Sequence, residues 1–343
     1  MAFRAPDIAI DLGTANTMLY VRGKGIVINE PTVAVVETRN RRAVRAVGDE
    51  ARYLMGRTKD TMKAVMPIKD GIIADFDAAE VLIRYFIRKA IGSSHLFRPR
   101  VLVSIPASLD EVPRKAFREA VTVAGAKEVI FVEKPLAAAI GSGLPVYDPI
   151  GSMVVDIGGG TTDTAVVSMG GIVVAQSIRV GGQKMDQAII AYLKKNSSIL
   201  IGESTAEDLK KDLAGAMPVT GANTVAHVRG FDLLSARVMD VEFSAAQAHD
   251  AVTEPCMAIL ASICWVLERT PPELAADVMR SGIHLTGGGS QLLGLDRLIA
   301  TRLGIPVLLA REPGDATILG MGYLVENHDL LAAVQASPIN QNS

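Results

Sequence analysis

The sequence of 343 residues has little cysteine, few aromatic side chains and almost no net charge. Its 2 cysteines, Cys256 and Cys264, provide no disulfide framework or cysteine-rich metal site, and we expect both to be buried thiols. The 5 histidines are scattered without metal-ligand spacing. Basic and acidic residues number 35 and 37, and aromatic residues make up 4%. Nucleic acid is therefore not expected as a partner, because binding it requires excess positive charge or rings on which bases stack.

Long apolar runs are also missing from the sequence. No uninterrupted stretch reaches the roughly 18 apolar residues that a membrane-spanning helix needs, and no apolar signal core precedes the first expected strand. We therefore expect a cytoplasmic, reducing location. The content of 49% hydrophobic and 21% charged residues is typical of a folded protein, long enough for two or three domains.

Hydrophobic periodicity predicts an α/β chain whose pattern begins twice. The expected elements of the first half are strands at 8–12 and 17–21, a third strand made of 26–29 with 33–36, a helix at 78–91, a strand at 101–105, a helix at 114–124 and a strand at 129–132. The segment from 39 to 63 has no strong periodicity. After Gly151, strands are expected again at 153–156, 164–168 and 172–175, and helices follow, including 205–213 and 320–334.

The two starts can be aligned with each other. Asp11 and Asp156 each lie at the end of an apolar strand, and glycine and threonine follow before the next strand. We interpret this repetition as a duplicated α/β domain in which both Asp-Gly turns face one cleft. A turn of glycine and threonine exposes backbone N–H groups and hydroxyls that suit phosphate oxygens. An aspartate repels phosphate, but it suits a Mg²⁺ ion that keeps its waters. If either Asp-Gly turn is considered alone, a plain hairpin turn is the alternative to a phosphate-binding turn.

Two further features are compatible with a nucleotide site. A glycine cluster at 287–289 follows an apolar strand and precedes a helix, a turn that allows close approach of a nucleotide or is simply tight. Glu207 and Lys210 are three residues apart in an expected helix and share a face. They form either an exposed ion pair or a clamp on a ribose and adenine.

Together these stretches resemble the actin superfamily of ATPases, which includes chaperone ATPases and sugar kinases, and the match is close to its MreB family of bacterial actins. The matching segments run in the family's order over nearly the whole chain: Asp11–Thr17, Pro135–Gly141, Val155–Thr162, Ser177–Gly182, Thr270–Ala275 and Leu285–Gly289.

The resemblance implies an actin-like fold, with two duplicated ribonuclease-H-like domains around a nucleotide cleft and a small subdomain inserted in each. Subdomain IA would comprise residues 1–33, 68–149 and 317–343, and subdomain IB residues 34–67. Subdomain IIA would comprise residues 150–182 and 246–316, and subdomain IIB residues 183–245.

The resemblance also implies that the cleft binds ATP or ADP, with Mg²⁺ held through water by Asp11 and Asp156. Carried over by motif, the nucleotide-binding residues would be Asp11, Gly13, Thr14, Ala15, Asn16, Gly158, Gly159, Gly160, Thr161, Glu207, Asp208, Leu209, Lys210, Gly287, Gly288, Gly289 and Ser290. The catalytic group would comprise Glu133, Lys134 and Thr161.

The sequence departs from the family pattern beside this site. Glu133 and Lys134 stand where the family usually has two acidic residues, the second of which positions or activates the attacking water. Lys134 is a cation at neutral pH and cannot accept a proton, so we expect slow hydrolysis. It could instead bind the γ-phosphate, or Glu133 or a shifted backbone could act in its place. Gln183 and Lys184 likewise replace an Asp-Glu pair, and Asp163 replaces a glutamate.

The function implied by the resemblance is an ATP-dependent filament on the inner face of the cell membrane that organises cell shape and cell-wall synthesis. The expected partners are further copies of the chain, the membrane surface and membrane proteins of the cell-wall elongation machinery. Leu96 and Phe97, followed by Arg98 and Arg100, would form the membrane-binding loop, with capping of the core as the alternative.

A sugar-type small-molecule kinase is the alternative function on the same fold. The sequence has no evident carboxylate base for an acceptor hydroxyl and no inserted substrate segment, and both are expected of such kinases. A chaperone-type ATPase is less favoured, because little sequence follows the helix expected at 320–334.

Overall fold

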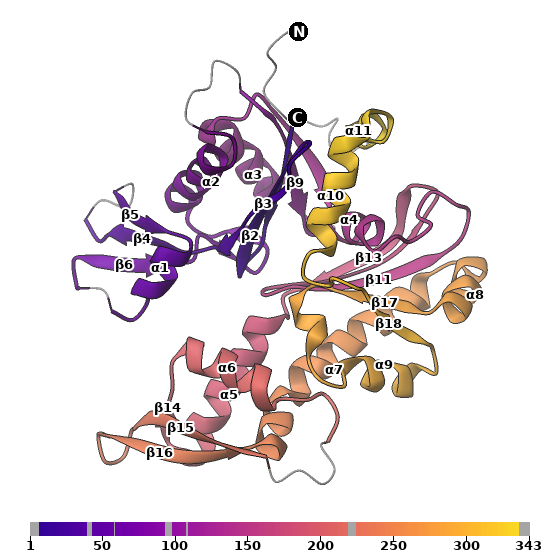
Figure 1. Cartoon of the computed structure of the whole chain (residues 1–343). Helices are drawn as coiled ribbons and strands as arrows, with labels where there is room; N and C mark the ends of the chain where they lie inside the picture. The colour runs from indigo at the N-terminus through magenta and orange to yellow at the C-terminus, as the bar shows by residue number, and fades with distance from the viewer. Residues whose placement is uncertain are drawn as a thin grey trace.

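Two five-stranded sheets form the centres of two α/β halves (Figure 1). The computed structural model describes residues 7–39, 43–57, 59–92, 98–107, 109–218 and 224–335. The strands of the first sheet lie in the order β10-β9-β1-β2-β3, and those of the second in the order β13-β12-β11-β17-β18. The first sheet comprises β1 (Ile8–Leu12), β2 (Asn16–Val21), β3 (Gly25–Pro31), β9 (Arg100–Ile105) and β10 (Glu128–Glu133). The second comprises β11 (Ser152–Ile157), β12 (Thr162–Ser168), β13 (Gly171–Ile178), β17 (Ile283–Thr286) and β18 (Val307–Leu309).

The two sheets share one topology. β1 pairs antiparallel with β2 and parallel with β9, and β11 pairs antiparallel with β12 and parallel with β17. The duplication predicted from the two Asp-Gly turns is therefore a duplication of strand order.

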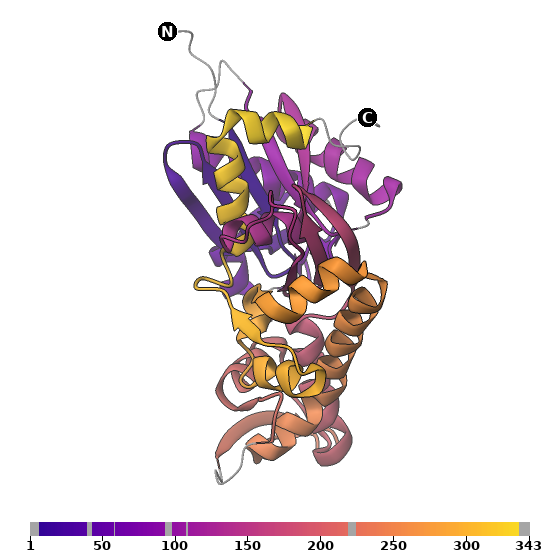
Figure 2. The same ribbon diagram turned by 90° about the vertical axis from the view of Figure 1, so that its right-hand side faces the viewer.

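The first sheet is covered by helices on both faces. Ile8, Ile10 and Leu12 alternate along β1 and pack in one cluster with α2 (Phe76–Ile91) and α3 (Glu111–Ala124). Ala9 lies on the opposite face, in a cluster with α10 (Ala316–Glu326). Figure 2 shows the yellow C-terminal helices lying along the indigo strands of this half.

The helix α4 (Lys134–Gly141) joins the two halves. Its Ala137 packs in the cluster that contains Ala9, whereas Ala138 and Ala139 pack against Val154 of the second sheet. The helix therefore lies between the sheets, and its first residue follows directly from β10.

On its other face the second sheet packs against long helices. They are α5 (Gly182–Ser197), α7 (Ala245–Arg269) and α9 (Leu295–Leu303), with α8 (Pro272–Ser281) after α7. By length and composition α7 could cross a membrane, but 50% of its most apolar window is buried inside the protein. Ile259 and Ile263 of α7 are fully buried in the core of this half, as expected of a core helix.

Each half also carries a three-stranded sheet, and both small sheets extend to the same side of the molecule (Figure 1). The first contains β4 (Ala34–Glu37), β5 (Val44–Val47) and β6 (Met62–Val65) beside α1 (Asp49–Leu54). The second contains β14 (Ile199–Leu200), β15 (Val225–Asp232) and β16 (Arg237–Ser244) near α6 (Glu203–Leu213). A short hairpin of β7 (Ile68–Lys69) and β8 (Ile72–Ile73) leads back to α2.

Three local predictions were wrong. The strand expected at 26–36 is two strands in different sheets, because β3 ends at Pro31, whose nitrogen cannot donate a ladder hydrogen bond. The aperiodic segment 39–63 contains β5, α1 and the start of β6. The helix expected at 320–334 is broken into α10 and α11 (His328–Gln335). At the break, the Asn327 amide donates to the carbonyl of Tyr323 over 2.7 Å, a local bond that ends α10.

The two thiols differ. Cys256 is buried, as expected, and burial raises its pKa to about 12, whereas Cys264 is only partly buried.

Candidate functional site

The two Asp-Gly turns meet at the junction between the halves. A Cβ atom on Gly160 would lie 2.4 Å from Thr14 Oγ1, and one on Gly159 would lie 2.8 Å from Ala15 Cβ. Only glycine lets the backbone of the second turn lie this close to the side chains of Thr14 and Ala15. The structure thus brings together two predicted segments, 13–16 and 158–161, that lie far apart in the sequence.

The third glycine segment packs behind the second turn. A Cβ atom on Gly287, whose φ is +79°, would lie 2.6 Å from Asp156 Oδ1, and one on Gly289 would lie 2.6 Å from Ile157. The segment continues into a 3₁₀ helix, Gly288–Gln291, before α9 begins at Leu295. The buried Ser290 hydroxyl donates to the carbonyl of Gly287 over 2.6 Å and holds this turn.

Strand register explains which side chains gather at the first turn. β1, β9 and β10 are parallel neighbours, so their carboxyl ends lie along one edge. Ile10 pairs with Val103, which sets Asp11 beside Ser104, and the Ser104 hydroxyl donates to Asp11 Oδ1. The same edge brings the end of β10, and with it Lys134, to Asp11.

Asp156 holds the equivalent position in the second sheet and is buried. β17 pairs it with Thr286, whose hydroxyl donates to Oδ1 over 3.2 Å. The hydroxyl of Thr317, at the start of α10, donates to Oδ2 over 3.3 Å. Neither threonine was among the predicted site residues, because each lies more than 100 residues from Asp156 in the chain.

Asp163 of β12 pairs with Asp156 of the neighbouring strand β11 and is fully buried. Its carboxylate accepts from the backbone N–H of Ala107 over 2.9 Å and from the Thr161 hydroxyl over 3.1 Å. Thr161, predicted as both a binding and a catalytic residue, thus has its hydroxyl directed to Asp163 in this structure.

Lys134 supplies the positive charge for these acids. Its Nζ lies 2.8 Å from Asp11 Oδ1, and its side chain is 11% exposed. Burial lowers the pKa of Lys134, but attraction to Asp11, Asp156 and Asp163 outweighs burial, and the pKa lies above its usual value. Burial raises the pKa of Asp156 to about 7 against the opposing effect of Lys134, and it also raises the pKa of Asp163.

Glu207 and Lys210 bind other partners and not each other. Lys210 Nζ lies 2.7 Å from Asp186 Oδ1 of α5 and donates to the carbonyl of Gly182 over 3.1 Å. The N–H of Gly182 in turn donates to the carbonyl of Gly158 over 3.0 Å. Lys210 is therefore tied to the second turn, as the prediction of a shared site requires.

Glu207 reaches across to the other half. Its carboxylate lies 2.6 Å from Arg52 of α1 and 2.7 Å from Lys211. Burial raises the pKa of Glu207, but the hydrogen bond from Lys211 and the charge of Arg52 outweigh it, and the pKa is lowered. Of the other predicted residues on α6, Asp208 is exposed, whereas Leu209 is buried in the core, so its side chain is not available to a ligand.

The donor set is suited to a metal held through phosphate and water. Among the described residues, no group of three or more His, Cys, Asp or Glu side chains could hold a metal ion directly. Asp11 and Asp156 are, however, buried or partly buried carboxylates at strand ends beside the glycine turns. Mg²⁺ commonly uses one or two carboxylates together with waters and substrate phosphates.

The expected membrane loop is only partly described. Leu96 and Phe97 lie outside the described residues. Arg98 is exposed, but Arg100 is 14% exposed and binds Asp7, with Nη2 2.6 Å from Oδ2 and Nε 3.2 Å from Oδ1. The prediction that both arginines face lipid head groups was therefore wrong for Arg100.

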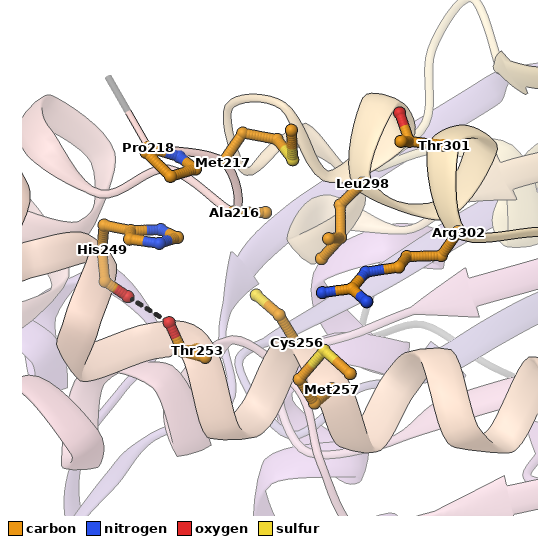
Figure 3. Close-up of a pocket in the computed structure, with 10 residues that line it drawn as sticks. All are labelled: Ala216, Met217, Pro218, His249, Thr253, Cys256, Met257, Leu298, Thr301 and Arg302. Atoms are coloured by element: carbon orange, nitrogen blue, oxygen red, sulfur yellow. Dashed lines mark hydrogen bonds between the residues drawn. The ribbon is translucent and has the colours of Figure 1, made fainter. Parts of the chain in front are cut away.

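A surface pocket of about 550 Å³ lies away from these residues, between α7, α9 and the segment 216–218 (Figure 3). It is lined by His249, Cys256 and Arg302 among others, and the His249 ring lies 2.8 Å from the carbonyl of Gly215. None of the predicted nucleotide residues lines it.

Comparisons with known proteins cover almost the whole chain. The family model described as MreB/Mbl protein matches residues 5–333. The cell shape-determining protein Mbl of Bacillus subtilis is 44% identical over 327 residues, which are 95% of this chain and 98% of the relative. The cell shape-determining protein MreB of Escherichia coli is 43% identical over 328 residues, 94% of each chain.

Solved structures of similar chains confirm the predicted actin-like fold class. MreB5 of Spiroplasma citri bound to ADP has a TM-score of 0.89 and 32% identity, and covers 98% of this chain and 99% of that one. The same protein bound to AMPPNP also has a TM-score of 0.89. A chain of the MamK double helical filament, at 19% identity and a TM-score of 0.77 over 94% of this chain and 99% of that one, shares the fold.

Proposed function

Because the chain belongs to the MreB/Mbl family, we propose that it is an ATP-dependent, filament-forming bacterial actin that organises cell shape and cell-wall synthesis. The observation that carries the proposal is the meeting of two Asp-Gly turns and a third glycine segment at the junction of the halves. Backbone N–H groups of such glycine turns suit the phosphates of ATP or ADP. Mbl of Bacillus subtilis and MreB of Escherichia coli are cell shape-determining proteins, and MreB5 of Spiroplasma citri is described with ADP and with AMPPNP.

The nucleotide residues keep their predicted roles in this proposal. The backbone of 13–16 and 158–160 would hold the phosphates, and Lys210 and Glu207 would lie toward the ribose and adenine. Gly287, Gly288, Gly289 and Ser290 would line the remaining side. Asp11 and Asp156 would hold Mg²⁺ through water, and the ion would neutralise phosphate charge.

Hydrolysis of ATP is proposed to be slow. A general base must accept a proton from the attacking water, and the ammonium of Lys134, held by Asp11, cannot accept one. Glu133 and Thr161 are the remaining candidates for positioning that water.

The protein is further proposed to be cytoplasmic and peripheral on the inner face of the cell membrane. The proposal rests on the sequence of the loop, in which Leu96 and Phe97 are followed by the exposed Arg98. Apolar side chains enter the acyl boundary and cations lie near the head groups. Membrane proteins of the cell-wall elongation machinery and other copies of this chain are the proposed protein partners.

Electron microscopy of the purified protein with ATP and MgCl₂ tests the function. We expect filaments for the wild type and for the control variant Asp329→Ala, which changes an exposed acid of α11. For Asp156→Ala we expect loss of Mg²⁺-dependent ATP binding by calorimetry, and no filaments. ATP turnover that requires a small acceptor, without filaments, would instead favour the sugar-kinase alternative.

A further inference from the structure

One lysine lies among the acids that would surround the bound phosphates. Lys134 is the first residue of α4, and its side chain is 11% exposed. Its Nζ lies 2.8 Å from Asp11 Oδ1, and the charges of Asp156 and Asp163 act on the same ammonium. Asp11 comes from the first half and the other two acids from the second, so one cation serves carboxylates of both halves.

The charge balance at this place depends on residue 134. With lysine, the four side chains carry one positive charge and, when every acid is ionised, three negative charges. With glutamate, the same ionised set would carry four negative charges and no positive charge. Carboxylates brought close to one another and to a polyphosphate repel unless a cation compensates, and the repulsion is strongest where water is excluded.

Two sources of compensating charge are available in such a site. A divalent cation must be recruited from solution and bridges carboxylates and phosphate oxygens through its waters. The ammonium of Lys134 is part of the chain and is already in contact with Asp11. Because it neutralises Asp11 in advance, a divalent cation bound there has less charge left to compensate.

We propose that Lys134 is a built-in counter-ion that makes nucleotide binding by this protein only weakly dependent on a divalent cation. The inference rests on the proposed function, that the junction binds ATP or ADP. Lys134 acts here as a residue that sets metal dependence by neutralising a neighbouring acid, and its role concerns affinity and not the chemical step.

A purely structural role for Lys134 makes a different prediction. If the ion pair only held α4 against β1, its loss would lower the melting temperature of the protein. The ratio of the nucleotide dissociation constants with and without Mg²⁺ would then stay the same in every variant that folds.

The experiment measures that ratio directly. Dissociation constants of ADP and ATP are determined by calorimetry in excess MgCl₂ and in excess EDTA. The proteins are the wild type, Lys134→Glu, Lys134→Gln, Lys134→Arg and the control Lys24→Glu. Lys24 is exposed in the turn between β2 and β3, at the end of β2 remote from Asn16.

Chelation is expected to weaken binding less than about tenfold for the wild type, Lys134→Arg and Lys24→Glu. For Lys134→Glu, the ratio is expected to be at least about tenfold larger than for the wild type, with Lys134→Gln between them. If Lys134→Glu does not fold by circular dichroism, the neutral glutamine variant carries the test alone.

The proposal would be overturned if EDTA weakened nucleotide binding by the wild type as much as it weakens binding by Lys134→Glu. If Lys134→Glu does not fold, Lys134→Gln takes its place in this comparison. An equal ratio in all variants would overturn it as well and leave Lys134 a structural role. The absence of any binding by the wild type, Lys134→Arg and Lys24→Glu in MgCl₂ is a separate result, because it would overturn the proposed nucleotide-binding function itself.

Discussion

Single residues decide the chemistry at the junction, and Lys134 is the clearest example. The ammonium contacts Asp11 at the position where relatives are expected to carry a carboxylate for the attacking water. It therefore removes a proton acceptor and adds a positive charge in one substitution. These two consequences can be separated by experiment.

Lys134→Glu is expected to raise the rate of phosphate release from ATP in excess MgCl₂. A positioned general base typically contributes about 10²–10⁴ in rate, so the gain should be measurable in a phosphate-release assay. Lys134→Gln removes the charge without adding a base, and its rate should stay near that of the wild type. Equal acceleration by both variants would contradict the assignment of a missing base.

The buried Asp156 is expected to make stability depend on pH. Because burial raises its pKa to about 7, the folded state keeps a proton on Asp156 in a pH range where the unfolded chain has lost it. The free energy of unfolding of the nucleotide-free protein should therefore fall as the pH rises from about 4 toward 7.

Asp156→Asn removes this titration and should be more stable than the wild type at pH 8, by about 4 kcal/mol at most. The advantage should shrink as the pH is lowered to 5, as followed by urea denaturation. Asp329→Asn, an exposed acid, serves as the control. A difference between Asp156→Asn and the wild type that is constant with pH would contradict the prediction.

At the scale of elements, α4 and α10 depend on two glycines for their close contact. A Cβ atom on Gly320 of α10 would lie 1.8 Å from the carbonyl oxygen of Ala137, and one on Gly141 would lie 1.9 Å from that of Ala316. Both contacts are with backbone, which cannot move aside as a flexible side chain can. The same helix pair carries Lys134 and Thr317 toward the acids of the junction.

Gly320→Ala is expected to force α4 and α10 apart and to lower the free energy of unfolding by about 1–3 kcal/mol or more. Gly314→Ala is the matched control, because nothing lies within 4 Å of the Cβ that it adds. Thermal unfolding followed by circular dichroism compares the two. Equal melting temperatures would show that the helices separate without cost.

At the scale of the whole molecule, an ion pair links the two small subdomains. Arg52 of α1 and Glu207 of α6 lie 2.6 Å apart, with side chains 46% and 27% exposed. An exposed pair of this kind contributes about 0.2–1 kcal/mol. It lies beside the proposed nucleotide site, so it should resist the separation of the halves that nucleotide release requires.

Arg52→Ala is accordingly expected to speed release of a fluorescent ADP analogue by about two- to fivefold in stopped-flow measurements. Arg45→Ala is the control, because Arg45 pairs with Glu37 inside one small subdomain. A release rate that Arg52→Ala leaves unchanged, or changes no more than the control does, would contradict a role for the pair in closing the molecule.

Membrane attachment is expected to depend on assembly. Burial of Leu96 and Phe97 provides at most about 3–6 kcal/mol, and much of this is lost when one molecule is immobilised at a surface. A filament presents many such loops, and their combined binding is firm. Only Arg98 remains to contact head groups on the C-terminal side, since Arg100 binds Asp7.

Co-sedimentation with anionic liposomes tests this expectation. The wild type with ATP should pellet with lipid, whereas Leu96→Ser/Phe97→Ser and a polymerisation-defective variant should stay in solution. Filaments that sediment without lipid are subtracted. Equal pelleting by all three proteins would exclude the proposed loop and its dependence on polymerisation.

The sequence by itself determined the fold class and the repetition at the centre of the site. Short apolar runs define β1 and β11, and the Asp-Gly turns at their ends are local patterns that can be recognised without knowing their partners. Glycines at 159 and 160 likewise indicate a place where other groups lie close to the backbone. Such features depend on neighbours in the chain, so a sequence carries them directly.

Only the tertiary structure decided which side chains meet. The distant partners of Lys134, Glu207 and Arg100 are Asp11, Arg52 and Asp7, each more than 90 residues away in the chain. The supporting hydroxyls of Ser104 and Thr317 were missed for the same reason. Charge pairing is set by strand register and by the packing of distant helices, and no local periodicity reports on either. The acids could therefore be named from the sequence, but their counter-charges could not.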